Sequence, residues 1–209
     1  MDFVDITPST MDPPPGPYPT SINTILCSLF SGVIIIALIA PFLSLHAAKQ
    51  LSACTVIIVT QLVLFFTFIN AILWPNDNIA NWWNGHGLCD IEVIVRSVSI
   101  TLIASSTASL TRNLSQAVDV DNNPCLFESA GMKRRRLAVE ILFCFGVPFI
   151  QLICHYFVQA GRYAILAVYG CTDVISNSWF TVFLFIIWPP IFCLLNCYYA
   201  SKLNPMSKT

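Results

Sequence analysis

The chain has 209 residues, of which 56% are hydrophobic and only 10% are charged, and its formal net charge is −1 at pH 7. A water-soluble domain of this length needs far more charge to cover its surface, so the composition argues against that class and indicates a membrane protein. The nine cysteines include no CxxC pair, which argues against a zinc or redox centre.

A proline-rich stretch opens the chain. Six of the first 20 residues are proline, and Lys and Arg are absent from that stretch. Such a segment cannot build a core, so we expect residues 1–21 to form a disordered extracellular lead. The lead has no basic n-region and the apolar run after it has full membrane length, which argues against a cleaved signal peptide.

Five apolar stretches follow, each close to the roughly 20 residues that a helix needs to cross a bilayer. They cover residues 22–45, 51–73, 88–111, 137–158 and 178–199. None shows the period-two alternation of a membrane barrel. The predicted fold class is therefore an all-α membrane protein, with five transmembrane helices in a bundle over residues 22–201. The Pro189-Pro190 pair inside the fifth stretch predicts a kink there.

The basic residues gather in alternate connections between these stretches. Residues 74–87 and 159–177 together hold one basic residue, Arg162, whereas the other connections and the tail hold Lys49, Arg112, Lys133, Arg134, Arg135, Arg136, Lys202 and Lys208. Basic loops stay in the cytosol, so we expect an extracellular N-terminus and a cytosolic tail at residues 202–209. Arg112 and the run from Lys133 to Arg136 are expected to contact anionic lipids or a cytosolic coupling partner.

Catalysis and ion transport find little support in the sequence. HExxH, GxSxG and Gly-rich phosphate-loop motifs are absent, and His46, His86 and His155 are far apart, so we expect no enzyme, no catalytic or metal site and no cofactor. The central parts of the five stretches carry no ionisable Asp, Glu, Lys or Arg, which weighs against an ion-coupled transporter.

The connection before the third stretch holds three of the five tryptophans, at Trp74, Trp82 and Trp83. An aromatic belt at the membrane interface explains such residues in general, but a loop with glycines, acids and a cysteine favours recognition. Cys89 and Cys171 are the two cysteines expected at the outer face in loop context. A disulfide between them is predicted, with two free thiols as the alternative.

Several short motifs in fixed order resemble a known family, the fungal mating-pheromone receptors of the a-factor-receptor type, which are class D G protein-coupled receptors. The motifs are Trp74-Pro75-Asn76-Asp77, Gly87-Leu88-Cys89-Asp90-Ile91-Glu92, Gly161-Arg162-Tyr163-Ala164-Ile165, Tyr169-Gly170-Cys171 and Ser178-Trp179 with Trp188-Pro189-Pro190. The resemblance implies a multipass plasma-membrane receptor for a lipidated, farnesylated peptide pheromone, coupled to a heterotrimeric G protein. It places at the pheromone entrance Asp77, Trp82, Trp83, Asp90, Glu92, Arg96, Arg162, Tyr163 and Trp179.

Members of that family have seven helices, whereas this sequence ends at Thr209, just past the fifth predicted helix. The expected product is therefore a receptor-like protein truncated after its fifth helix. Two alternatives stay open, a non-signalling scaffold or decoy that pairs with a full-length receptor, and a small multipass carrier. A receptor dimer also stays open, and a nucleic-acid partner is not indicated.

Overall fold

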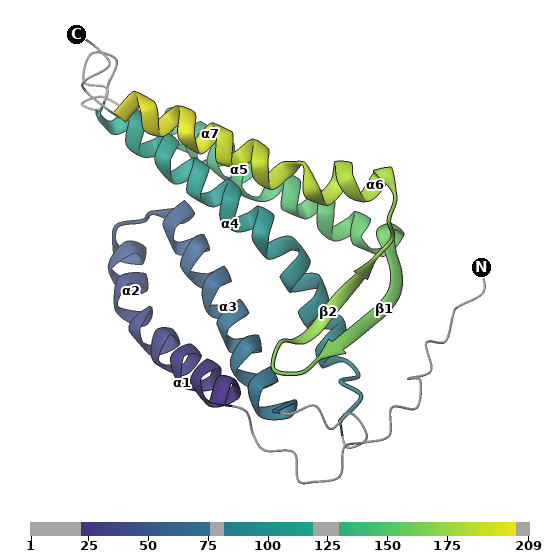
Figure 1. Cartoon of the computed structure of the whole chain (residues 1–209). Coiled ribbons are helices and arrows are strands. Elements are labelled where there is room, and N and C mark those ends of the chain that lie inside the picture. Colours follow the sequence, from purple (N-terminus) through teal and green to yellow (C-terminus); the bar gives the residue numbers. More distant parts are fainter. Residues whose placement is uncertain (1–21, 76–81, 119–129, 204–209) are drawn as a thin grey trace.

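The computed structural model describes residues 22–75, 82–118 and 130–203 (Figure 1). The predicted extracellular lead at 1–21, Asp77, and residues 204–209 of the predicted tail lie outside these ranges. Within them, helical segments and one β-hairpin make up the fold.

The helices follow one another along the chain as successive passes through a bundle. The first pass is α1 (Ile22–Ala37), continued after Leu38 by α2 (Ile39–Ala47), and the next three are α3 (Leu51–Leu73), α4 (Leu88–Val118) and α5 (Ala130–Val158). The last pass consists of α6 (Trp179–Thr181), the π-helix η3 (Val182–Ile186) and α7 (Trp188–Leu203). The predicted class, an all-α membrane protein, is confirmed, with the hairpin as an addition.

Four segments of the described chain are long and apolar enough to cross a membrane, namely Ile22–Ala47, Leu51–Leu73, Gly131–Val158 and Trp179–Leu203. Their outward faces carry large exposed apolar side chains such as Ile36, Leu142 and Leu194, each about 70% exposed. Exposed apolar surface on this scale belongs in a bilayer. The chain is therefore a multipass membrane protein.

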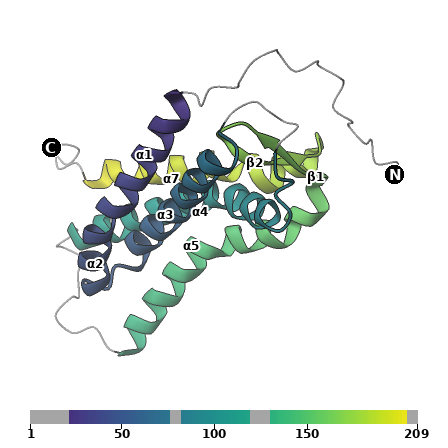
Figure 2. The same cartoon turned by 90° about the horizontal axis from the view of Figure 1, so that it is seen from below.

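Helix α4 contains the remaining predicted span, residues 88–111, and is the central helix of the bundle. It packs against α3, α5 and α7 (Figures 1 and 2). Its inward face is polar, because Ser99, Thr101, Ser105, Ser106 and Ser109 are buried. Small hydroxyl side chains allow helices to approach closely and to hydrogen-bond across the contact.

Two of these serines show how the contacts are made. The Ser105 hydroxyl donates to the Cys144 carbonyl of α5 at 2.8 Å, and the Ser52 hydroxyl of α3 donates to Ser109 Oγ at 3.0 Å. The Ser52 backbone N–H also donates to the Glu140 carboxylate of α5 at 3.2 Å. A carboxylate at the N-terminus of α3 complements the positive end of that helix.

An antiparallel hairpin, β1 (Gln159–Leu166) with β2 (Gly170–Ile175), connects α5 to α6. The sequence predicts only a connection at residues 159–177, so the strands are an addition to the predicted fold. The hairpin lies across the ends of α3 and α4 (Figure 1), and both strands pack against α4. We call this the hairpin end of the bundle, and the opposite end, where Lys133–Arg136 lie in the first two turns of α5, the basic end.

Candidate functional site

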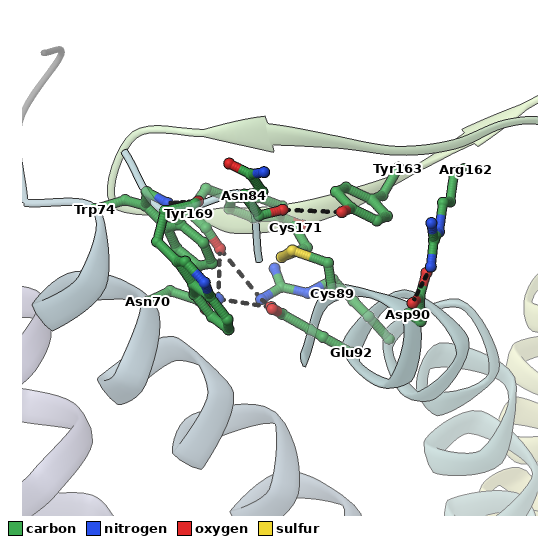
Figure 3. Close-up of a disulfide and its surroundings, with 12 residues drawn as sticks. Asn70, Trp74, Asn84, Cys89, Asp90, Glu92, Arg162, Tyr163, Tyr169 and Cys171 are labelled. Carbon is green, nitrogen blue, oxygen red and sulfur yellow. Dashed lines mark hydrogen bonds and ion pairs between the residues drawn. A yellow bond between two sulfur atoms is a disulfide. The ribbon is translucent and has the colours of Figure 1, made fainter. Parts of the chain in front are cut away.

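A disulfide fastens the hairpin to the bundle. Cys89 in the first turn of α4 is bonded to Cys171 of β2, as the sequence predicts, and both side chains are fully buried (Figure 3). Gly85 lies directly against it, because a Cβ at that position would stand 2.3 Å from Cys89 Sγ. Gly85 also has a φ of +66°, so glycine is required both by conformation and by space.

Trp74 forms the apolar centre beside the disulfide. Its side chain is fully buried and clusters with Val93, Cys89 and Cys171, so it is a core residue and not part of an interfacial belt. Its indole Nε1–H donates to the Trp83 carbonyl at 3.2 Å, and its ring stacks on Trp83 with centroids 6.4 Å apart. Trp83 itself is 50% exposed, which leaves part of its ring available at the surface.

A buried charge joins α3, α4 and the hairpin turn. Glu92 is fully buried, and its Oε1 accepts from Arg96 Nη2 at 2.7 Å and from Asn70 Nδ2 at 2.6 Å (Figure 3). The same two donors reach the Tyr169 carbonyl, at 3.3 Å and 3.0 Å respectively. The Arg96 guanidinium also lies 4.2 Å from the Tyr169 ring centroid. A buried carboxylate needs such partners to stay charged, so the network holds the turn in place.

A second ion pair lies at the surface. Arg162 of β1 donates to both carboxylate oxygens of Asp90, at 2.9 Å and 2.8 Å. The hydrogen bond to Asp90, with the attraction between the two charges, raises the pKa of the Arg162 guanidinium above its ordinary value. Next to it, the Tyr163 hydroxyl donates to the Asn84 carbonyl at 2.8 Å. The pair and the tyrosine present charge and aromatic surface at the hairpin end.

The structure thus brings together most of the predicted entrance residues, and Trp82 packs partly buried against the disulfide cluster. Trp179 stands apart, because it is 79% exposed at the start of α6 and does not belong to that cluster. The basic residues Arg112 and Lys133–Arg136 lie at the basic end, where the four on α5 are exposed. Within the described ranges, no three His, Cys, Asp or Glu side chains gather as a metal site would require.

Sequence reasoning did not single out Asn70 and Tyr169 as site residues. Asn70 is an uncharged polar residue within the predicted span 51–73, and Tyr169 belongs to the Tyr169-Gly170-Cys171 motif. A fully buried asparagine in an apolar helix has to find a partner, which was the available signal for Asn70. The hydrogen bonds of Tyr169 in this network are made by its backbone carbonyl, which side-chain chemistry cannot reveal.

Comparisons with known proteins point to one family. The family model described as Pheromone A receptor (STE3) matches residues 26–204. Relatives include the pheromone a factor receptor of Saccharomyces cerevisiae, 23% identical over 167 residues that make up 79% of this chain and 35% of that protein. The pheromone B alpha 1 receptor of Schizophyllum commune is 26% identical over 149 residues, which are 70% of this chain and 22% of that protein.

Pheromone receptor 1 of Mycosarcoma maydis is 27% identical over 116 residues, covering 52% of this chain and 32% of that protein. The chain therefore spans about a third or less of the length of these curated relatives. No solved structure matches it.

Proposed function

The chain belongs to the pheromone A receptor (STE3) family, and from this premise we propose that it acts as a plasma-membrane receptor for a lipidated peptide mating pheromone and signals through a heterotrimeric G protein. The observation that carries the proposal is the extent of the family match. Residues 26–204 include nearly all of the helical passes and the whole hairpin.

We place the pheromone contact at the hairpin end. Exposed or half-exposed side chains from three parts of the chain meet there, namely Trp83, Asp90, Arg162 and Tyr163. Aromatic faces combined with a polar charged pair suit a peptide that carries both apolar and polar groups. Glu92 is fully buried beneath the hairpin turn, so its proposed role is to support this surface and not to touch the ligand.

We place the cytosolic contacts at the basic end, with the N-terminus outside the cell. The charge distribution supports this orientation, since basic residues favour the cytosolic side. The exposed run Lys133–Arg136 lies in the first two turns of α5, and Arg112 lies near the end of α4. These residues are the proposed contacts for anionic lipid headgroups and for the G protein.

Binding and signalling can be tested together in yeast cells that lack their own pheromone receptor and carry a pheromone-response reporter. The tagged chain is exposed to fluorescent peptides that end in an S-farnesyl cysteine methyl ester and to the same peptides without the lipid. We expect saturable surface binding of the lipidated form and a reporter response. Normal surface expression without saturable binding of any candidate peptide would overturn the proposal.

The same experiment distinguishes the second candidate, a non-signalling decoy or scaffold. Saturable binding without a reporter response would favour a decoy. Co-expression with a full-length receptor then measures whether the chain lowers that receptor's response, which would identify a partner complex and decide between decoy and scaffold. A carrier would instead move the labelled peptide into the cell.

A further inference from the structure

The last helical pass contains a π-turn near its start. In η3 (Val182–Ile186) the helix widens, and the Ile187 N–H donates to the Val182 carbonyl, five residues back, at 3.0 Å. Figure 1 shows this pass interrupted between α6 and α7. A π-turn holds one residue more than the corresponding α-helical turn, and such turns occur mostly at functional sites.

The sequence just after the π-turn explains why the helix widens. Pro189 and Pro190 have no backbone N–H, so the carbonyls four and five residues before them lose their usual donors. For Pro189 these carbonyls belong to Phe185 and Leu184. Inside a membrane an unpaired carbonyl is costly, and neighbouring helices commonly supply the missing donor.

Gln151 of α5 supplies that donor. Its Nε2 donates to the Leu184 carbonyl at 2.5 Å, and the side chain is only 1% exposed. The amide is only half satisfied, because its Oε1 has no hydrogen-bond partner among the described residues. Gln151 therefore stabilises the π-turn through one hydrogen bond, which joins α5 to the turn beside the contact between the His155 and Phe185 rings.

The surroundings of the π-turn leave it room to rearrange. A half-open cavity of about 400 Å³ lies at the surface between α5 and the α6–η3 segment, lined by Cys154, Phe157, Val158, Ser178, Phe180 and Leu184. On the other side, the Thr181 hydroxyl donates to the Ser176 carbonyl at 2.6 Å. The turn is thus joined through a few residues to β2, which ends at Ile175.

We propose that Gln151 and the π-turn form a two-register hinge. With Gln151 bonded to the Leu184 carbonyl, the extra residue stays in η3. When that bond breaks, the segment rewinds as an α-helix and passes the extra residue to the linker 176–178. One residue corresponds to about 100° of helix rotation, so Trp179 and Phe180 at the hairpin end turn relative to α7. Gln151 is the positioning residue of this hinge, and the inference does not depend on the identity of the ligand.

Native cysteines report the state of the hinge in the full chain. Cys154 lines the cavity beside the π-turn, whereas Cys27 lies on α1. The alkylation rate of Cys154 by N-ethylmaleimide is measured in native membranes by peptide mass spectrometry and divided by that of Cys27. We expect Gln151→Leu to raise this ratio about two- to tenfold, the population change that loss of one hydrogen bond produces. The matched control Gln61→Leu, the same substitution on α3, should leave it unchanged.

A second substitution tests whether the missing N–H of Pro189 is the reason that the Leu184 carbonyl needs Gln151. Pro189→Ala restores an N–H that can reach the Leu184 carbonyl, five residues back, so Gln151 is no longer needed. We expect the double variant Gln151→Leu, Pro189→Ala to return the Cys154 ratio to the wild-type value. If Gln151→Leu alone does not accumulate in membranes, the double variant should accumulate. An unchanged ratio in Gln151→Leu, or a failure of Pro189→Ala to reverse its effect, would overturn the hinge.

Discussion

Asn70 of α3 and Glu92 of α4 form a hydrogen bond of 2.6 Å between two fully buried side chains. The bond joins two helices, and because Asn70 also donates to the Tyr169 carbonyl, it joins both helices to the hairpin turn. A charge in this position is stable only while its donors stay in place. The hairpin end is therefore held together by a buried polar network that lies beside the buried disulfide and Trp74.

Removing either member of this bond should destabilise the fold, but to different degrees. Glu92→Gln leaves the Arg96 guanidinium without its carboxylate and should cost about 3 kcal/mol, whereas Asn70→Leu removes one donor and should cost about 1–2 kcal/mol. Thermal unfolding of the purified protein in detergent measures both, with Gln61→Leu on α3 as control. Equal effects of the two variants would contradict the asymmetry.

The disulfide should matter more than any single hydrogen bond. Cys89 and Cys171 are 82 residues apart in the sequence, and closing a loop of that length stabilises a fold by about 4 kcal/mol. We expect Cys89→Ser, Cys171→Ser and the double variant to lose surface expression to the same extent. Cys193→Ser, at an exposed free cysteine, is the control. Non-reducing peptide mapping of the wild type should recover the linked pair, and two free thiols there would refute it.

The surface pair of Asp90 and Arg162 should affect ligand binding more than stability. Both side chains are partly exposed, at 35% and 61%, and exposed pairs contribute little to folding. Asp90→Asn and Arg162→Gln should unfold near the wild-type temperature yet bind the lipidated peptide probe more weakly. The exchange Asp90→Arg with Arg162→Asp should recover part of the binding if the pair orients the hairpin. No recovery would indicate that one charge contacts the ligand directly.

The two stacked tryptophans should separate folding from binding. Trp74 is fully buried, so Trp74→Ala should cost about 3–5 kcal/mol and reduce the amount of folded protein. Trp83 is half exposed, so Trp83→Ala should leave a folded chain at the surface with weaker probe binding. Surface immunostaining and probe binding on the same cells measure the two effects. A Trp83 variant that binds normally would remove this residue from the proposed contact surface.

The helices were largely predictable because membrane thickness fixes their length. The predicted span 51–73 coincides with α3, where apolar character ends sharply on both sides. Helix α5 starts at Ala130, before the predicted residue 137, because the basic residues 133–136 are good helix formers that continue the helix beyond the apolar run. Hydropathy marks where a helix is buried in lipid, and it does not mark where the helix begins.

The hairpin and the pairings at its base were not predictable in the same way. Strands of eight and six residues are short, and their pairing depends on contacts that the local sequence does not contain. Asp90 and Arg162 were each expected near the entrance, yet their contact joins residues 72 positions apart. The bond between Asn70 and the Tyr169 carbonyl exists only after the hairpin has folded over α3.

Gly170 provides the most specific test of how closely the hairpin turn approaches α3. Its φ is +87°, and a Cβ added there would lie 1.9 Å from Asn70 Nδ2. Gly87, with a φ of +83°, has nothing within 4 Å of the same added atom. Gly87→Ala therefore isolates the conformational cost, about 1–2 kcal/mol, whereas Gly170→Ala adds the displacement of Asn70 from Glu92 and from the Tyr169 carbonyl.

We expect Gly170→Ala to lower the unfolding temperature clearly more than Gly87→Ala, by about 2–4 °C for each additional kcal/mol in a chain of this size. The Gly170→Ala, Asn70→Ala double variant removes the clashing side chain, so beyond Asn70→Ala alone it should lose only the conformational cost that Gly87→Ala measures. Non-additivity of this kind is the signature of direct contact. Equal effects of the two glycine variants would mean that the hairpin turn does not pack against Asn70. The hydrogen bond from Asn70 to the Tyr169 carbonyl would then be absent from the buried network.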